Sequence, residues 1–566
     1  MLIGIDLGTT NSLAACYIDG EARIIPNRFG EELTPSVVSI NEKDEVLVGT
    51  LALEYGRTHP LDCAKVFKRA MGTPKKFILQ GRCFSAPELS AIVLRSLKED
   101  AQDYLGCEVD QAIISVPAYF NELQRSATAQ AGELAGLNVV RIINEPSAAA
   151  LAYGAGPYGA EEKCVVFDLG GGTLDVSILD INSGIIEVHA IAGDNFTGGE
   201  DFTRVLADIF LEKALIAPET LDIKTMNEVT RVAEKAKIQL SALKSVNMSC
   251  MIANEVIVKT ISESEFNSKC KELKNRIRRP VERAIRDSGL RLSDIDRVLL
   301  VGGATKLPMV RNYVAGLFSA FPQMGVDPVK AVAVGAAMAC GMKERKEELK
   351  EIIFIDVCPF TLGTEIVVFN GSFDEPGHYM PIIERNTVIP VSRSQTVYTA
   401  HDDQTRVCVK ILQGESRKAE GNLRLGEITV PVPAAPAGEE SVNITYTYDI
   451  NSLLEVEVKV NSTGEKRRLI IQNGDTGLTD AELAERFKRL EYLKRNPKDD
   501  ERNALLLLRG ERLYEESNMD DRELIDREMM KFERILFGQD RAKIESARLH
   551  LKEIFDGIER PEYSHQ

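Results

Sequence analysis

Residues Ile3-Gly-Ile-Asp-Leu-Gly-Thr-Thr-Asn-Ser12 and Val165-Val-Phe-Asp-Leu-Gly-Gly-Gly-Thr-Leu-Asp-Val-Ser177 follow one plan. In each segment an apolar run leads into Asp-Leu-Gly, a Gly/Thr turn follows, and a second strand-like run begins. Glycine lets such a turn bring backbone N–H groups close to an anion. Threonine hydroxyls add donors, and an Asp at the strand end can hold a cation or orient water. Two such hairpins predict a duplicated domain that holds a polyphosphate from both sides.

A third glycine turn, Val301-Gly-Gly-Ala-Thr-Lys306, follows another apolar strand and opens a helix. The Gly-Gly pair lets a flat ring or a sugar approach the backbone, and a helix N-terminus favours anions. The chain contains neither G-x-x-x-x-G-K-[ST] nor G-x-G-x-x-G. We therefore expect a nucleotide site that is neither a P-loop nor a dinucleotide-binding turn.

Composition narrows the class of protein. A chain of 566 residues is too long for one core, so two to four domains are expected. The net charge of -17 argues against general binding of nucleic acid or of an anionic membrane. There is no apolar run of about 18 residues and no leader-like start, so we expect neither a membrane span nor a signal peptide. The ten cysteines are scattered, which favours buried thiols and a cytoplasmic location.

The texture of the sequence changes along the chain and predicts a multidomain fold of α/β, then β, then α type. Strands alternate with helices over 1–350, and a short apolar linker, Ile352-Ile-Phe-Ile355, lies within 351–357. Apolar residues then alternate with polar ones over 358–476, clearest from Val442 to Ile450, which indicates antiparallel strands. Helical spacing fills 477–566, beginning with a capping-box pattern at Thr479 and Glu482.

A helix expected near 229–244 carries a row of polar side chains on one face. Val232, Ala236, Leu240 and Leu243 share its apolar face. The opposite face aligns Glu234, Lys237 and Ser241. Such a row is usually a solvated surface, but it also suits hydrogen bonds to ribose hydroxyls and an adenine edge.

Together these motifs resemble the DnaK-type chaperones, the seventy-kilodalton heat-shock family. The resemblance rests on the two Asp-Leu-Gly hairpins and Val301-Gly-Gly, and on Val116-Pro-Ala-Tyr-Phe-Asn121, Arg141-Ile-Ile-Asn-Glu-Pro-Ser-Ala-Ala-Ala150 and Ala233-Glu-Lys-Ala-Lys237. Length and the short tail most resemble the HscC branch. The family implies a duplicated actin-like (ribonuclease-H-like) ATPase domain, an antiparallel β-sandwich that binds peptides, and a short helical lid.

The resemblance also implies site residues and cofactors. ATP or ADP would bind with Mg²⁺ and K⁺, and the hydrated cations would be organised by Asp6, Asp168 and Asp175. The implied catalytic residues are Asp6, Lys68, Glu145, Asp168 and Thr173. The implied nucleotide-binding residues are Gly8, Thr9, Thr10, Gly170, Gly171, Gly172, Gly198, Gly199, Glu234, Lys237, Ser241, Gly302 and Gly303. Lys306, Val329 and Lys330 depart from the family pattern around adenosine, which suggests weaker or faster-exchanging nucleotide.

Coupling and partners follow from the same resemblance. The implied relay from the phosphates to the linker is Pro117, Arg125, Glu145, Ile353, Phe354 and Asp356. The implied peptide-binding residues are Thr364, Ile366, Val367, Val397, Ala400 and Val407. The expected partners are unfolded or extended polypeptides and a J-domain cochaperone, which would engage Arg141, Asn144 and Asp356. Reliance on a nucleotide-exchange factor stays open.

Two other classes share the phosphate hairpins. A sugar kinase would place a catalytic Asp base and a hydroxyl-binding cleft in the first 350 residues. An actin-like filament protein would also use the duplicated clamp. Neither class has a use for the linker and the β region, so residues 352–566 favour the chaperone.

Overall fold

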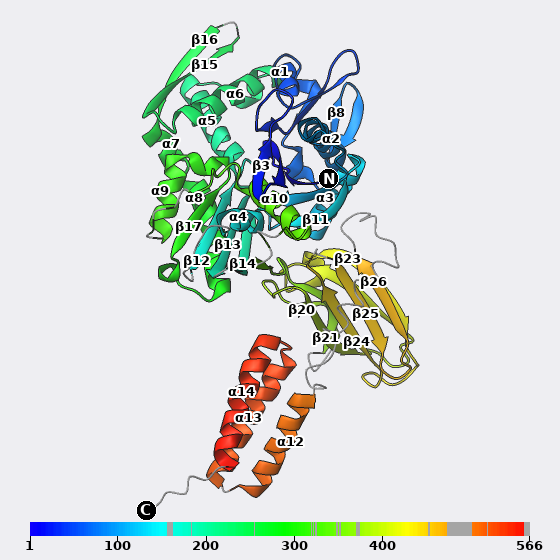
Figure 1. Ribbon diagram of the computed structural model, residues 1–566. Coiled ribbons are helices and arrows are strands. Elements are labelled where there is room, and N and C mark those ends of the chain that lie inside the picture. Colours follow the sequence, from blue (N-terminus) through cyan, green and yellow to red (C-terminus); the bar gives the residue numbers. More distant parts are fainter. Residues whose placement is uncertain are drawn as a thin grey trace, which may run out of the picture.

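The computed structural model describes residues 1–154, 162–182, 184–253, 255–318, 320, 322, 325–346, 349, 352–369, 374–450, 453–471, 501–517 and 519–559. Figure 1 shows a large α/β body, a β body and a separate group of helices, in chain order. This order agrees with the predicted fold class. The domain limits stay predictions, because the capping-box pattern at Thr479 and Glu482 and the expected boundaries at 350/351 and 476/477 lie outside the described residues.

The first half of the α/β body is built on a sheet with the order β11-β10-β1-β2-β3, with β4 added to β2. β1 pairs in parallel with β10 and antiparallel with β2. Helices α2 and α3 and the short strand group around α1 complete this half. The bounds are β1 Leu2–Asp6, β2 Asn11–Ile18, β3 Glu21–Ile25, β4 Thr34–Pro35, β5 Val37–Ile40, β6 Val46–Val48, α1 Thr50–Thr58, β7 Cys63–Lys65, β8 Lys76–Leu79, β9 Arg82–Ser85, α2 Ala86–Leu105, β10 Gln111–Val116, α3 Glu122–Leu134 and β11 Asn138–Asn144.

The second half repeats this plan in the order β17-β12-β13-β14-β18. β12 pairs in parallel with β17 and antiparallel with β13, as β1 does with β10 and β2. The duplication predicted from the two hairpins is therefore visible in the strand topology. The bounds are α4 Glu145–Gly154, β12 Glu162–Leu169, β13 Leu174–Asn182, β14 Ile185–Asp194, α5 Gly199–Ala214, α6 Ile223–Gln239, β15 Ser245–Ile252, β16 Glu255–Ser262, α7 Glu263–Lys269, α8 Lys271–Ser288, β17 Arg297–Val301, α9 Pro308–Phe318, α10 Ala331–Lys343 and β18 Ile353–Ile355.

Two alanine- and glycine-rich helices, α4 and α10, join the halves. A side chain at Gly335 of α10 would overlap the backbone of Ala148 in α4. A side chain at Gly4 of β1 would likewise overlap the backbone of α10 at Ala337. Only small residues permit these approaches, so the composition of both helices fixes how closely the two sheets meet.

The β body is a sandwich of two four-stranded antiparallel sheets, β20-β19-β22-β23 and β21-β24-β25-β26. Val442, Ile444, Tyr446 and Tyr448 of β24 are buried in its core. The alternation was expected to continue to Ile450, but β24 ends at Tyr448 and Ile450 lies 51% exposed beyond it. The bounds are β19 Leu362–Phe369, β20 Asp374–Ile383, β21 Val391–Tyr398, β22 Arg406–Gln413, β23 Leu423–Pro431, β24 Ser441–Tyr448, β25 Leu454–Val460 and β26 Lys466–Ile471.

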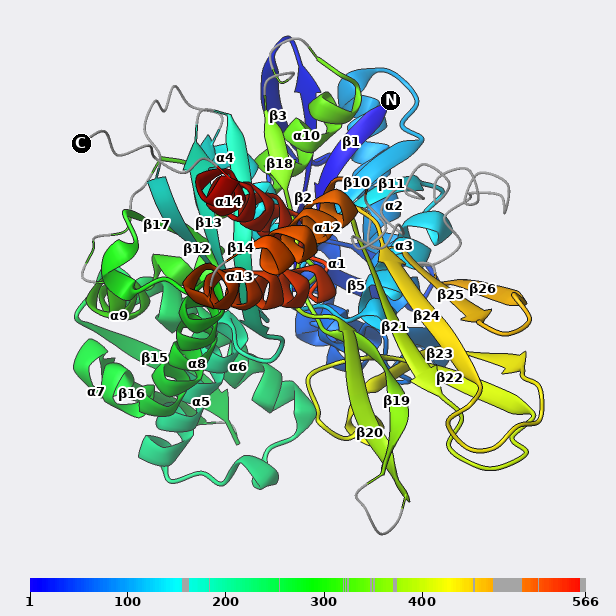
Figure 2. The ribbon, with the colours of Figure 1, turned by 90° about the horizontal axis from the view of Figure 1, so that it is seen from below.

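Three helices, α12 (Glu501–Glu516), α13 (Met519–Phe537) and α14 (Arg541–Glu559), pack around their own apolar core. Figure 2 shows them in front of the α/β body when the molecule is seen from below. They agree with the helical spacing expected over 477–566. None of the helices in the described ranges combines the length and apolar character needed to cross a membrane.

Two expectations need correction. Helix α6 ends at Gln239, so Leu243 lies outside it and is 51% exposed, whereas Ala236 and Leu240 are buried as predicted. The cysteines are free thiols, but they are not all buried, because Cys83, Cys107 and Cys408 are exposed.

Candidate functional site

The turns of the two Asp-Leu-Gly hairpins lie against each other where the two halves of the α/β body meet. One turn joins β1 to β2 and the other joins β12 to β13. A side chain added at Gly171 would overlap the Thr10 hydroxyl, and one at Gly172 would lie 2.7 Å from the Thr9 Cγ2 atom. The turns therefore touch, and only glycine permits the contact.

A cavity of about 380 Å³ opens beside this contact. Its lining contains most of the residues implied by the resemblance, which come from both sheets and from α4, α5 and α6. They are Asp6, Gly8, Thr9, Thr10, Lys68, Glu145, Asp168, Gly170, Gly171, Thr173, Gly199, Glu234, Lys237, Ser241, Gly302 and Gly303.

Three of the expected residues support the wall from behind instead of lining the cavity. A Cβ atom at Gly198 would lie 2.5 Å from the Gly171 carbonyl oxygen, so Gly198 holds the second phosphate turn. Gly172 packs on Thr9, and Asp175 is 1% exposed beneath the surface. The sequence motifs missed several lining residues, because they are apolar or lie on separate elements: Leu13, Leu33, Glu200, Ile238, Ala304, Leu307, Pro328 and Val332.

Lys68 and Glu145 form a buried ion pair at one end of the cavity. The Lys68 Nζ atom lies 2.7 Å from Glu145 Oε1, and the two side chains are 3% and 10% exposed. Lys68 sits on a single turn of 3₁₀-helix, Phe67–Ala70, and Glu145 begins α4. The pair holds a positive ammonium group next to the predicted phosphate turns without exposing it to bulk water.

Four carboxylates, Asp6, Glu145, Asp168 and Asp175, share this buried region. Burial and the nearby Glu145 raise the pKa of Asp6 to about 7. The same two causes raise the pKa of Asp175 to about 8. The pKa of Asp168 is also raised well above its ordinary range, by burial and then by the other three carboxylates. One lysine does not balance four acids, so the site favours an added cation.

The donor set fits a cation that keeps its water shell. Within the described residues, no group of three or more His, Cys, Asp or Glu side chains could hold a metal ion on its own. Mg²⁺ usually keeps several waters and binds through one or two carboxylates together with substrate phosphates. Asp6 and Asp168, which line the cavity, therefore suit Mg²⁺ held through water beside a polyphosphate, with Asp175 buried behind them.

The far end of the cavity offers polar groups for a nucleoside. Lys237 donates to the Gly199 carbonyl (3.0 Å) and to Thr203 Oγ1 (2.8 Å), and it pairs with Glu234 Oε2 at 2.6 Å. Ser241 lies one turn further along, two residues beyond the end of α6 at Gln239. The row that the sequence placed on one helix face therefore points into the cavity instead of into solvent.

The third glycine turn closes this end. Gly302 has a φ of 83°, and a side chain there would overlap the Leu169 carbonyl. A side chain at Gly303 would meet nothing within 4 Å, so its backbone borders open space. Two of the residues that depart from the family pattern around adenosine form ion pairs. Lys306 pairs with Asp327 at 3.1 Å, and Lys330 pairs with Glu32 at 2.5 Å.

Comparison with known proteins gives the family. The family model described as "Hsp70 protein" matches residues 2–79 and 75–564, which is nearly the whole chain. The chain belongs to the Hsp70 family. The DnaK-type resemblance is thereby confirmed, and the family is one of ATP-dependent molecular chaperones. Membership of the HscC branch stays a prediction.

Individual Hsp70 relatives agree. The chain is 39% identical over 484 residues to a "Chaperone protein DnaK" of Thermosipho africanus (strain TCF52B), covering 83% of this chain and 79% of the relative. A "Heat shock 70 kDa protein, mitochondrial" of Pisum sativum is 38% identical over 544 residues, covering 90% and 78%.

The Hsp70 relay implied by the resemblance can be followed as contacts. Arg125 is fully buried and donates to the Phe120 and Ala118 carbonyls and to Asn144 Oδ1 at 2.5 Å. Asn144 Nδ2 donates in turn to Asp356 Oδ2 at 3.2 Å. Because Asn144 precedes Glu145 in the chain, these contacts join the Lys68–Glu145 pair to the linker.

Other residues near this end of the linker add contacts or are themselves buried. Ser147, which the motifs did not single out, donates to Asp356 Oδ2 at 3.2 Å. Pro117 begins the turn that holds Phe120, whose N–H donates to the Pro117 carbonyl. Asn144 and Asp356, expected to engage a J-domain, are both less than 9% exposed here.

The linker is docked as an edge strand. β18 pairs in parallel with β14, and the Ile353 N–H donates to the Gly184 carbonyl at 2.8 Å. Phe354 packs against the core shared by the two halves, whereas Ile353 is 53% exposed. Ile352 and Phe354, rather than Ile353, therefore provide the apolar anchoring.

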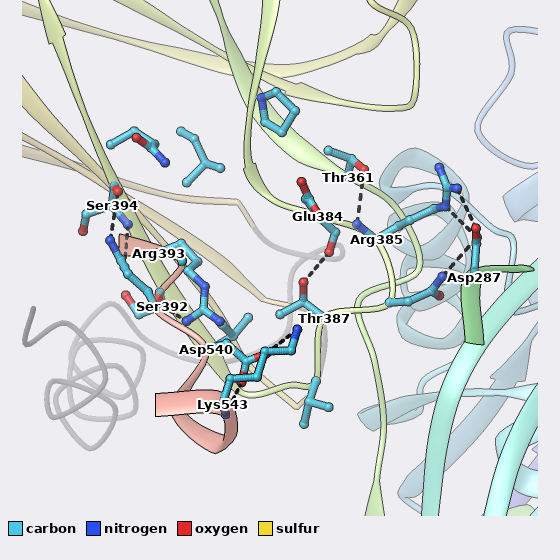
Figure 3. A pocket seen from close by; sticks show the side chains of 18 of the residues that line it. Asp287, Thr361, Glu384, Arg385, Thr387, Ser392, Arg393, Ser394, Asp540 and Lys543 are labelled. Carbon is cyan, nitrogen blue, oxygen red and sulfur yellow. Dashed lines mark hydrogen bonds and ion pairs between the residues drawn. The ribbon is translucent and has the colours of Figure 1, made fainter. Parts of the chain in front are cut away.

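The β body also contacts the α/β body directly. Arg385 makes two hydrogen bonds to Asp287 of α8, at 2.8 and 2.9 Å, as Figure 3 shows. Arg385 also pairs with Glu415 at 2.7 Å. The Glu122 N–H at the start of α3 donates to Gln413 Oε1 at 2.9 Å. A cavity of about 1360 Å³ lies beside these contacts, where both bodies meet the α13–α14 corner.

The residues implied in peptide binding lie on both sheets of the sandwich. Thr364 on β19 is 1% exposed, whereas Val367 on the same strand is 40% exposed and Ile366 is half-buried. Val397 on β21 and Val407 on β22 pack half-buried against the sandwich core. Ala400 follows β21, and its N–H donates to Gln404 Oε1. Their role in holding a peptide stays a prediction.

Proposed function

We propose that the α/β body binds and hydrolyses ATP, and that the nucleotide controls how the β body holds extended apolar polypeptide segments. The observation that carries this proposal is the docked linker. Its Asp356 accepts a hydrogen bond from Asn144, the residue that precedes Glu145, and Glu145 pairs with Lys68. A change at the phosphates that moves Glu145 would therefore act on Asp356 and on the strand β18.

The chemistry proposed is phosphoryl transfer to water, in which positioning and charge neutralisation supply most of the catalysis. Backbone N–H groups of the two glycine turns and the hydroxyls of Thr9, Thr10 and Thr173 would hold the phosphates. Lys68 would neutralise charge that develops on the transferred group, and Glu145 would orient the attacking water. Mg²⁺, when bound near Asp6, Asp168 and Asp175, would supply further charge neutralisation. We also propose K⁺ at this site.

The partners and location remain proposals of the same kind. A J-domain cochaperone is proposed from the resemblance, and dependence on an exchange factor stays open. We expect a cytoplasmic location, although the relatives include both a bacterial DnaK and a mitochondrial heat-shock protein. A sugar kinase or a filament-forming ATPase is not favoured, because the family model extends through residue 564.

ATP turnover measured with and without an unfolded polypeptide tests the proposal. Reduced, carboxymethylated α-lactalbumin serves as a permanently unfolded probe. We expect slow turnover by the full chain alone and an increase of about fivefold or more at saturating probe, the lower range of allosteric coupling. The native, disulfide-bonded form of the same protein is the control and should have little effect. Turnover that no concentration of the unfolded probe changes would contradict the proposal.

A further inference from the structure

A loop between β3 and β4 has a fixed shape and forms part of the cavity wall. Asn27 is 8% exposed, and its Oδ1 atom accepts from the N–H groups of Phe29 and Glu31, each at 3.0 Å. The Asn27 Nδ2 atom donates to the Leu33 carbonyl at 3.4 Å. Leu33 lines the cavity, and Glu32 precedes it on the same loop. Glu32 therefore stands beside a wall residue on a loop that is held by its own hydrogen bonds.

A second stretch of the wall is the turn that leads into α10. Pro328 and Val329 line the cavity. The Pro328 carbonyl accepts from the N–H of Gly302, in the third glycine turn, at 2.8 Å. Asp327 Oδ1 accepts from the Val329 N–H at 3.1 Å, and the Asp327 carbonyl accepts from the Lys330 N–H at 2.9 Å. This turn is thus tied to the third glycine turn, and it places Lys330 at the start of α10.

Four side chains of alternating charge run along these two stretches. Lys330 Nζ lies 2.5 Å from Glu32 Oε2, and Lys306 Nζ lies 3.1 Å from Asp327 Oδ1. Burial raises the pKa of Asp327, but a backbone hydrogen bond and the charges of the two lysines outweigh it and hold the pKa below its ordinary value. Asp327 therefore stays charged beside both lysines. Such a network contributes more than an isolated exposed pair.

We propose that Glu32 and Lys330 are positioning residues whose ion pair closes the wall of the cavity at its nucleoside end and slows the release of bound nucleotide. This inference rests on the proposed function. Without the pair, the neighbouring wall residues Leu33 and Val329 are free to move apart, and the nucleoside leaves more easily. The departure of Lys330 from the family pattern suggested faster exchange, whereas the pair predicts the opposite effect for this position.

The test measures release of N-methylanthraniloyl-ADP, a fluorescent probe, from the full-length chain after mixing with excess ADP. Glu32→Gln and Lys330→Gln should each release the probe about 2- to 5-fold faster, the size expected from a partly exposed ion pair. The double variant should be no faster than the faster single variant, because both changes break one pair. Lys330→Arg keeps the charge and should release the probe at the wild-type rate. High salt should speed release from wild type toward the rate of the variants.

Controls separate this pair from general damage. Lys213→Gln breaks an ion pair of similar exposure with Glu265, 2.7 Å long and near the end of α5, and should release the probe as wild type does. Affinity for inorganic pyrophosphate with Mg²⁺, measured by titration calorimetry, should stay the same in every variant, because this ligand has no nucleoside.

The possible failures are distinguishable. A wild-type chain that binds neither the probe nor pyrophosphate would overturn the proposed function itself. Wild-type release rates in both single variants, or additive effects in the double variant, would overturn the role of the pair. Weaker pyrophosphate binding in Glu32→Gln or Lys330→Gln would also overturn it, because the effect would then reach beyond the nucleoside end.

Discussion

At the residue scale, Lys68 is a buried basic side chain that is positioned for the proposed reaction by its ion pair with Glu145. Burying an ammonium group is costly unless a partner compensates, and Glu145 at 2.7 Å provides that partner. The pair holds the lysine next to the turns that contain Thr10 and Gly171. A charge held in place before the substrate arrives needs no reorganisation during the reaction.

Replacing Lys68 by Ala should abolish hydrolysis while nucleotide binding survives. The loss removes charge neutralisation at the transferred group, and we expect kcat for ATP to fall by about 100-fold or more. ADP affinity should change little, because Gly199, Gly302 and Gly303 remain. Lys65→Ala, an exposed lysine three residues earlier, is the matched control. Wild-type turnover in the Lys68 variant would remove this residue from the mechanism.

At the scale of elements, the strand β18 and the start of α3 are the parts that make docking conditional. β18 is only three residues long and pairs on one side, with β14. A strand of this length is not stable alone, so its order depends on the contacts of Phe354 and Asp356.

Phe354→Asp should release the linker. A carboxylate at this half-buried position would be desolvated without a partner, so pairing of β18 with β14 becomes unfavourable. Hydrogen exchange at Ile353–Ile355 should accelerate about tenfold or more, and stimulation of ATP turnover by unfolded polypeptide should disappear. Ile353→Thr keeps a β-branched residue at the exposed neighbour and should preserve both. Slow exchange in the Phe354 variant would show that the linker is held by other contacts.

The Glu122 carboxyl makes docking sensitive to pH. It is 3% exposed at the start of α3, where it faces Arg125 of its own helix and Asp449 at the end of β24, near the Cys358 thiol. Burial raises its pKa from 4.5 to about 8, with Asp449 adding to the rise and Arg125 opposing it. The docked state therefore binds a proton more tightly than the undocked state. Protonation of Glu122 therefore favours docking at low pH, and this contribution is lost as pH rises from about 4.5 through about 8.

Between pH 6 and pH 8 the docking equilibrium should weaken by about 50-fold, the size that a pKa shift from 4.5 to about 8 gives. The docking equilibrium is measured by hydrogen-exchange protection of the Ile353–Ile355 amides, corrected for the intrinsic exchange rate at each pH. Glu122→Gln should stay docked across this range, because the amide carries no charge. Glu439→Gln, at an exposed glutamate of the β body, should retain the wild-type pH profile. An identical profile in Glu122→Gln would exclude this carboxyl as the source.

At the scale of the whole molecule, local patterns predicted the elements better than the contacts between them. The two hairpins predicted the duplication because each holds its own glycines, and the structure repeats the same strand order around both. Period-two alternation predicted the antiparallel strands of the β body, but not that β24 would end before Ile450. Helical spacing extended α6 to Leu243, although the helix ends four residues earlier.

The same difference holds for the candidate site. Asp168 and Gly302 were predicted from their glycine-rich motifs and Lys68 from the family resemblance, and all three line the cavity. Ser147 was visible only as part of a motif, since its partner Asp356 is 209 positions away in the sequence. In the sequence, Glu122 is an ordinary acidic residue at the start of a helix. Its unusual environment comes from Gln413 and Asp449 of the β body, which lie close to it only in the folded chain. Such roles depend on the tertiary contacts, which no local pattern encodes.

The central claim is that nucleotide in the α/β body sets the affinity of the β body for extended polypeptide. Its most direct test is the Kd of full-length protein for a fluorescently labelled unfolded polypeptide, measured by anisotropy at saturating Mg²⁺ with ATP and with ADP. Lys68→Ala holds the ATP unhydrolysed during the measurement. The account predicts that the two Kd values differ by about tenfold or more. Equal Kd values in the two nucleotide states would contradict it.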